Sequence, residues 1–129
     1  MAIYVMDKTY RITTSGGVSS ARVVVAGGES GQCALPGAAN AGSILGIAVT
    51  SQPDSGRAVS VRKAGTAEVV AAGAIAAGAP VNIADTSGRV KEVNEATGTK
   101  VQCVGFAETA ATAAGDVIEV FLTIHERTA

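Results

Sequence analysis

Few side chains in this sequence could carry out nucleophilic or metal chemistry. His125 is the only histidine, and it lies near the C-terminus in the charged run His125-Glu126-Arg127. Cys33 and Cys103 are the only cysteines, and they form no CxxC or Cys/His pattern. A catalytic triad needs a base held between a nucleophile and a third group, and a structural zinc site needs four nitrogen or sulfur ligands. The sequence therefore predicts no metal site and no cofactor, with His125 as a solvated terminal residue.

Two pairs of carboxylates could in principle act as acid and base. Asp116 and Glu119 form one pair, and Glu92 and Glu95 form the other. Residues three apart on a strand face opposite ways, so each pair diverges if its strand is regular. The chain also lacks a phosphate-binding GxxxxGK[ST] loop and a GxSxG nucleophile elbow. We therefore predict solvated strand faces and a protein that is not an enzyme.

Lys63 supports an alternative function. A lysine at the end of a predicted strand resembles the modified lysine of lipoyl and biotinyl carrier domains, which are also small and rich in β-structure. A carrier lysine sits at an exposed hairpin tip, usually flanked by Asp or Met. Here Arg62 precedes it and Ala64 follows. A carrier or small-ligand-binding domain remains an alternative, and a lipoyl or biotinyl adduct on Lys63 would support it.

Composition excludes several classes of partner. The net charge is -1, only 16% of residues are charged, and the ten basic residues are scattered, so no basic stripe matches a nucleic-acid backbone. Aromatic content is 3% and there is no Trp. We expect no apolar run long enough for a membrane span and no signal peptide at the N-terminus. We also expect Cys33 and Cys103 to be reduced, half-buried thiols rather than a disulfide.

The chain must position these residues almost entirely with strands. Alternating or β-branched runs are separated by Gly-rich turns at spacings of about 8 to 12 residues, which is typical of a small all-β sandwich or barrel. Gly73 and Gly78 oppose a helix in the alanine-rich stretch 71–80, where we expect at most one turn. The predicted strands cover residues 8–13, 22–26, 33–35, 43–49, 58–62, 66–70, 80–84, 89–93, 100–108 and 116–124.

Two stretches of the sequence match when one is shifted by 59 positions. The identical pairs are Gly46/Gly105, Ala48/Ala107, Thr50/Thr109, Gly56/Gly115 and Val61/Val120. Ahead of them, Val23 and Val25 correspond to Val81 and Ile83 after a slip of one or two residues, which a surface loop tolerates. We therefore expect two pseudo-repeated β units, at about residues 21–63 and 78–122, within a single domain spanning 21–129.

The first twenty residues differ from the rest. Residues 1–20 contain a short apolar run, a short alternating run and a Ser/Gly-rich joint, so we expect an N-terminal arm or peripheral strand rather than part of the core. Ile3, Tyr4 and Val5 are costly to leave in water, which favours docking on a partner. With Tyr10 they form our candidate partner-binding residues.

The order of the motifs resembles a known family. The carrying stretches are LGIAVTSQPDSGRAVSVRKAGTAEVV, AAGAIAAGAPVNIADTSGRVKEV and VGFAETAATAAGDVIEVFL. In this order and spacing they resemble the capsid decoration, or cement, proteins of tailed phages, of the lambda head-decoration kind. Ala74, Ile75 and Gly78 match the entry to the second unit, and Gly115 and Asp116 match its close. The segment 36–42, PGAANAG, is longer than the family pattern suggests.

The resemblance implies a fold, a location and a partner. It implies a β-tulip-like fold and a homotrimer that binds the major capsid protein on the outer surface of a mature head, assembled in the host cytoplasm. The implied function is a structural virion protein that stabilises the shell. Our own hypothesis for the mechanism is that the N-terminal arm adds a strand to the shell or to a neighbouring trimer. Another phage head or tail protein is the remaining alternative.

Overall fold

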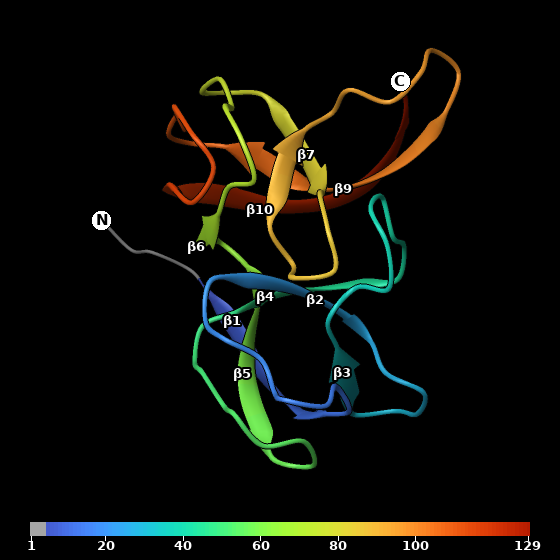
Figure 1. Ribbon diagram of the computed structural model, residues 1–129, viewed down its shortest axis with the longest axis vertical. Coiled ribbons are helices and arrows are strands. Elements are labelled where there is room, and N and C mark those ends of the chain that lie inside the picture. The colour runs from blue at the N-terminus through green and yellow to red at the C-terminus, as the bar shows by residue number, and fades with distance from the viewer. Residues whose placement is uncertain (1–4) are drawn as a thin grey trace.

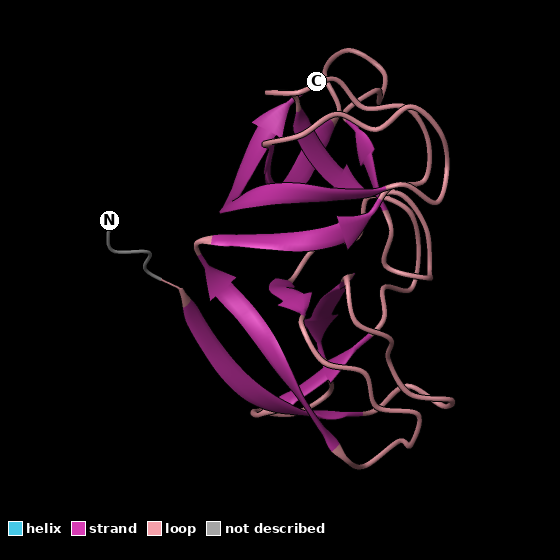
Figure 2. Cartoon of the chain, turned by 90° about the vertical axis from the view of Figure 1, so that its left-hand side faces the viewer, coloured by secondary structure: helices cyan, strands magenta, loops and turns pink. Residues whose placement is uncertain are grey.

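The computed structural model describes residues 5–129 and contains ten strands and no helix (Figures 1 and 2). The first five are β1 (Met6–Ile12), β2 (Arg22–Ala26), β3 (Gln32–Ala34), β4 (Ile44–Ala48) and β5 (Ala58–Ala64). The other five are β6 (Thr66–Val70), β7 (Pro80–Ile83), β8 (Val90–Glu92), β9 (Lys100–Ala107) and β10 (Val117–Thr128). The all-β prediction is confirmed. Residues 5–129 contain no helix long and apolar enough to cross a membrane.

The strands form two lobes, one above the other in Figure 1. The barrel lobe, β1–β5, is a closed barrel with the order β1-β3-β2-β4-β5. The sheet lobe, β6–β10, is a five-stranded sheet with the order β6-β10-β9-β7-β8. A single residue, Gly65, joins the lobes, and its φ of 88° turns the chain sharply between β5 and β6.

Both lobes use the same strand connections. If β1–β5 are matched in order with β6–β10, every pair of adjacent strands in the barrel lobe has its counterpart in the sheet lobe. The closing pair also recurs, since β1 and β3 are parallel and the sheet lobe has one parallel bridge between Ala71 and Val90. Three hydrogen bonds recur 59 residues later: Ser60 N to Thr50 Oγ1 as Glu119 N to Thr109 Oγ1, Gly56 N to Ile12 O as Gly115 N to Ala71 O, and Ile12 N to Arg57 O as Ala71 N to Asp116 O.

The register also corrects the expected alignment at the start of the units. Val24 lies opposite Gly46 on β4, and Val81 lies opposite Gly105 on β9. Val81 is therefore the counterpart of Val24. The sequence alone had matched Val81 with Val23, which is one residue earlier. β2 and β7 also share a register shift just after this position, which supports the matching of Val24 with Val81.

The N-terminal residues are not a separate arm up to residue 20. β1 pairs with β5 over most of its length and with β3 at its end, so it is a barrel strand. Its side chains Tyr10 and Ile12 are buried, and Val18 after it is buried as well. The strand belongs to the core because the alternation in residues 8–12 directs Tyr10 and Ile12 to one face. Residues 1–4 lie outside the part of the chain that the structure describes.

The two lobes share a core across β2 and β4. Val24 and Ala48 face the interior of the barrel lobe, whereas Val23 and Ile47, on the opposite face of the same strands, pack into the core of the sheet lobe. Val23 and Val24 are both fully buried, and the third valine of β2, Val25, is half-buried. Because successive side chains of a strand point to opposite faces, β2 is a strand with apolar contacts on both sides.

The sheet lobe is completed by the barrel lobe. Its edge strands β6 and β8 are joined by one bridge, Ala71 to Val90, and β2 lies beside the end of β6 and the turn before β8. Val70 N donates to Ala21 O at 3.0 Å, and Val23 N donates to Gly88 O at 2.8 Å. β2 therefore fills the gap between the two edges and supplies part of the second core.

The long segment 36–42 fastens the lobes from the other direction. Asn40, with a φ of 55°, donates its backbone N–H to Ile83 O at 2.9 Å and its side-chain amide to Lys100 O at 3.2 Å. Asn is among the few non-glycine residues that adopt a positive φ readily. The extra length of this loop is thus used to reach β7 and β9.

Candidate functional site

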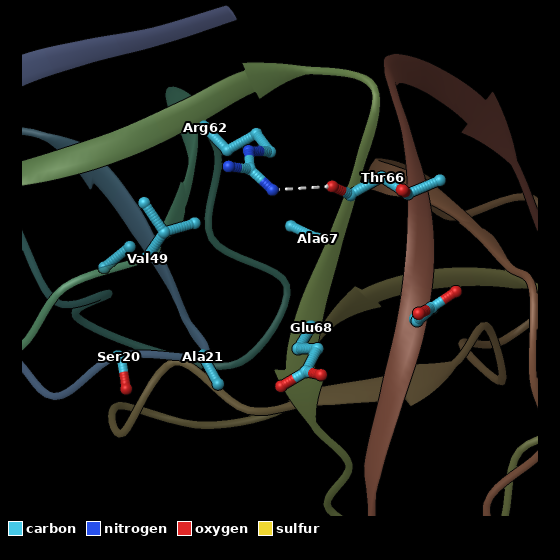
Figure 3. Close-up of a pocket in the computed structure, with 9 residues that line it drawn as sticks. Ser20, Ala21, Val49, Arg62, Thr66, Ala67 and Glu68 are labelled. Atoms are coloured by element: carbon cyan, nitrogen blue, oxygen red, sulfur yellow. Dashed lines mark hydrogen bonds between the residues drawn. The ribbon is translucent and has the colours of Figure 1, made fainter. Parts of the chain in front are cut away.

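A shallow pocket of about 350 Å³ lies between the lobes (Figure 3). Arg62 comes from the end of β5 and Glu68 from β6, while Ser20 and Val49 come from loops of the barrel lobe. The remaining lining residues are Ala21, Ala48, Thr66, Ala67 and Glu119. The pocket therefore forms where the one-residue connection brings the lobes together.

Arg62 is held by three hydrogen bonds. Its Nε and Nη2 donate to the two carboxylate oxygens of Asp7, at 2.9 and 3.2 Å, and its Nη1 donates to Thr66 O at 3.1 Å (Figure 3 shows the last). The hydrogen bond from Arg62 holds the pKa of Asp7 below its usual value. This bidentate pair ties β1, β5 and β6 together, so the guanidinium acts as a structural clamp.

Two glutamates face each other on the sheet lobe. Glu68 on β6 lies directly opposite Glu119 on β10, and both side chains are exposed. Neither forms a salt bridge within residues 5–129. Like charges directly opposite on neighbouring strands are destabilising. At the equivalent place in the barrel lobe, the neutral pair Thr9 and Ser60 lies across β1 and β5.

The other carboxylates considered from the sequence bind within the fold. Asp116 accepts bonds from the backbone and hydroxyl of Thr112 and from Ala113 N, and these bonds lower its pKa. Glu92 accepts a bond from Ala76 N at 3.0 Å. Asp116 closes a turn, and Glu92 holds the loop before β7.

Glu95 belongs to a buried polar network. Lys91 Nζ donates to its carboxylate at 2.7 Å, and the amide of the fully buried Asn82 donates at 2.9 Å. Burial pushes the pKa of Glu95 up, but the bonds from Lys91 and Asn82 outweigh it and leave the pKa below its usual value. The network fixes the loop after β8 against β7, which is a structural role.

The apolar side chains on the surface gather on β10 and at the start of β1. Val117, Phe121 and Ile124 expose 55, 46 and 42% of their surface, and Val5 and Met6 expose 45 and 54%. In β10 the inward residues Ile118, Val120 and Leu122 are apolar, and the outward residues Val117 and Phe121 are apolar on either side of Glu119. Apolar residues on both faces of the strand were the sequence signal for an exposed stripe.

The predicted partner-binding residues do not form one site. Ile3 and Tyr4 lie outside the described residues, and Val5 is exposed. Tyr10 was wrongly placed on a binding surface, because only 6% of it is exposed. Its ring packs in the barrel core, and its hydroxyl accepts a bond from Lys63 Nζ at 2.6 Å.

The same contact bears on the carrier alternative. Lys63 lies within β5 rather than at a hairpin tip, and its ammonium group sits 5.1 Å from the centroid of the Tyr10 ring. A carrier lysine has to extend freely so that its attached group can visit other active sites. The position of Lys63 supplies no such freedom.

His125 and the cysteines also differ from expectation. His125 is not in a solvated tail but in β10, opposite Cys103, and its ring stacks on Phe106 with the centroids 5.3 Å apart. Cys33 and Cys103 are free, as expected, but fully buried rather than half-buried. Burial raises the pKa of both thiols, which keeps them protonated.

Comparison with known proteins agrees with this account of the molecule. The family model described as phage cement protein matches residues 6–122, from β1 to the middle of β10. The comparison with curated proteins returns no match. Among solved structures, the head fiber gp8.5 N base of bacteriophage phi29 superposes with a TM-score of 0.64 at 16% identity, covering 93% of this chain and 95% of that one. This similarity shows a shared fold. With the family matched over nearly every strand, the chain belongs to the phage cement proteins and is a structural protein of a phage head.

Proposed function

We propose that this protein decorates the outer surface of a mature phage head as a trimer and stabilises the shell. The observation that carries the proposal is the cement-protein match, which spans both lobes rather than a local motif. Three of the four carboxylates considered from the sequence, Glu92, Glu95 and Asp116, bind other groups of the fold, and Glu119 lies on the exposed face of β10.

The exposed stripe on β10 suits subunit or capsid contacts. Val117, Phe121 and Ile124 are exposed along β10, with the charged Glu119 between the first two. Interface cores are depleted in charge and enriched in aromatic side chains, so this stripe fits an interface better than it fits open water. Ile3, Tyr4 and Val5 remain proposed contact residues, whereas Tyr10 is withdrawn because it is buried.

The proposed mechanism is linkage between binding and expansion. A protein that binds only the expanded lattice of the major capsid protein stabilises that lattice by mass action. Three copies held in one trimer engage several shell sites at once, so weak individual contacts add up to tight attachment. The rigid fastening of the lobes through β2 and Asn40 keeps those contacts at fixed spacing.

Binding to isolated heads tests the proposal. Purified protein is mixed with expanded heads that lack decoration and, as the matched control, with unexpanded precursor heads, and both are sedimented. We expect saturable binding to the expanded heads alone, and a higher temperature of DNA release once they are coated. Equal binding to both kinds of head, or to neither, would contradict the proposal.

A second candidate function is a base that anchors a fibre on the head. It is favoured by the similarity to the phi29 head fiber base, which covers 95% of that chain. Electron microscopy of coated heads separates the two: decoration gives compact knobs on the shell, whereas a fibre base carries a filament. Filaments on native virions at the sites of this protein would favour the second candidate.

A further inference from the structure

The last strand has an edge that no other strand covers. β10 is 12 residues long and lies between β6 and β9, but β6 pairs with it only from Val117 to Phe121. Leu122 N then donates to Gly65 O at 2.9 Å. Beyond this point, β9 pairs with β10 as far as Thr128, and no other strand within residues 5–129 pairs with residues 123–128.

The open edge presents regular backbone donors and acceptors. Ala129 N donates to Thr99 O, and Ala129 O accepts from Gly98 N, so these groups face the β9 side. Backbone groups alternate sides along a strand, which directs the N–H and C=O of Glu126 and Ile124 to the open side. Residues 123–128 extend about 20 Å and curve away from the barrel lobe (Figure 1). A strand edge of this kind is a template for another strand.

The barrel lobe contains no such edge, because its matching strand stops. β5 ends at Ala64, and Gly65 turns the chain into β6. The residue 59 positions after Gly65 is Ile124, where β10 continues as a strand through a register shift against β9. The open edge is therefore an addition to the repeated unit, and the strand that would cover it has no counterpart inside the molecule.

The N-terminal segment has the length and composition of a covering strand. Residues 2–6 read Ala-Ile-Tyr-Val-Met, five consecutive apolar residues rich in strand formers. A six-residue segment in extended form spans about 20 Å, which equals the open edge. Val5 and Met6, where the segment joins β1, keep about half of their surface in solvent, so residues 5–129 do not cover them.

We propose that residues 1–6 of one copy add as a strand to residues 123–128 of a second copy. The contact joins the N-terminal segment of one chain to the open edge of β10 in the next, so each chain both inserts a segment and accepts one. Three chains joined in this way close a ring, and in this respect the inference rests on the proposed trimer. Exposed Ile124 on the receiving edge gains apolar contacts from the incoming side chains.

Two variants separate the giving surface from the receiving one. Glu126→Pro removes an N–H that faces the open edge and leaves the groups facing β9 in place, a change that edge strands tolerate. Removal of residues 1–5 deletes the segment but keeps β1. Glu126→Ala is the matched control, because it removes the same side chain and keeps the N–H. Circular dichroism and thermal unfolding verify that each variant is folded.

The readout is solution mass by light scattering. We expect the full chain and the control variant Glu126→Ala to be trimers, with three times the 12.7 kDa mass of one chain. We expect Glu126→Pro and the chain without residues 1–5 each to be monomeric. An equimolar mixture of the two variants should give a two-chain complex and nothing larger. In that mixture, only the segment of the Glu126→Pro chain and the edge of the truncated chain are intact.

Two results would overturn the inference: a monomeric full chain, and a trimer that survives both changes. If the full chain is a monomer and removal of residues 1–5 speeds amide exchange at Glu126, the segment pairs with its own chain instead. If both variants remain trimeric and still coat expanded heads, the inference about the strand is wrong but the proposed function is supported. Failure to coat heads would defeat that function whatever the oligomeric state.

Discussion

The two lobes share their connections but differ in what completes them. The barrel lobe closes on itself through two parallel pairs between β1 and β3, whereas the sheet lobe has a single bridge at the same place and needs β2 as a wall. Ile47 and Phe106 occupy matching positions in the register, yet Ile47 is fully buried under the sheet lobe and Phe106 is half-buried. The same framework therefore supports an internal surface in one lobe and an external surface in the other.

The largest effect should come from what the lobes have in common. A Cβ at Gly46 would lie 2.1 Å from Arg62 O, and a Cβ at Gly105 would lie 1.9 Å from Phe121 O. Backbone cannot move aside cheaply, so Gly46→Ala and Gly105→Ala should each lower the free energy of unfolding by about 3 kcal/mol or more. Urea unfolding measures both, with Gly73→Ala as control because nothing lies within 4 Å of its Cβ. If either substitution leaves the free energy of unfolding unchanged, the neighbouring strand is not packed closely against the glycine in that lobe.

The next effect should separate the lobes. Ile47→Ala removes a fully buried side chain from the shared core and should cost about 2 to 5 kcal/mol. Phe106→Ala at the matching position removes a half-buried ring stacked on His125 and should cost about 1 kcal/mol, since less apolar area is uncovered. Thermal unfolding of the two variants compares them. Equal losses would mean that the outer face of the sheet lobe is covered, for instance by a second copy.

The polar network exists only in the sheet lobe and should make that lobe sensitive to acid. The folded pKa of Glu95 is lowered, so its contribution is present above its unfolded value of about 4.5 and is lost as the pH falls through the folded value. Glu95→Gln should therefore show a shallower loss of stability below about pH 4.5 than the parent chain. Unfolding midpoints between pH 3 and 7 test this. Glu108→Gln is the matched control, because it makes the same change at an exposed glutamate outside the network.

The smallest effect concerns the facing glutamates. Replacing Glu68 with Thr, the residue that the barrel lobe has at the matching place, should raise the free energy of unfolding by about 0.2 to 1 kcal/mol by removing the repulsion with Glu119. The gain should shrink as salt is added, because salt screens exposed charges. Unfolding at low and high salt measures it. A loss of stability in low salt would indicate that Glu68 has a favourable partner in the folded protein.

The sequence was sufficient to predict most of the strands. The bounds of β2 and β6 match the predicted ranges 22–26 and 66–70, because each is a short β-branched run between turn residues. The recurrence of Gly46 and Gly105 was also visible, and the structure gives its reason: each lies against the backbone of the neighbouring strand. Local pattern is enough where the cause is local.

The errors concern long-range pairing. Tyr10 was taken for a surface residue because nothing near it in sequence shows that β5 lies alongside and that Lys63 reaches its hydroxyl. The run at His125 was taken for a tail because its charges suggest solvent, yet β9 offers it a ladder from Cys103 to Lys100. For the candidate surface, the sequence indicated Val5 but not the stripe of Phe121 and Ile124. Their exposure depends on which face of β10 the two lobes leave uncovered.

The position of β2 has a consequence for the order in which the chain can fold. The barrel lobe leaves the ribosome first and contains every strand that it needs to close. The second half of the chain can fold against this template, because the wall of its core, Val23 and Ile47, belongs to strands that are synthesised before β6. A fragment that starts at Gly65 would lack that wall and expose the strand edges of β6 and β8. The order of the two lobes in the chain therefore matters for folding. Synthesis of the barrel lobe first provides the wall that the sheet lobe needs, because the sheet lobe cannot close alone.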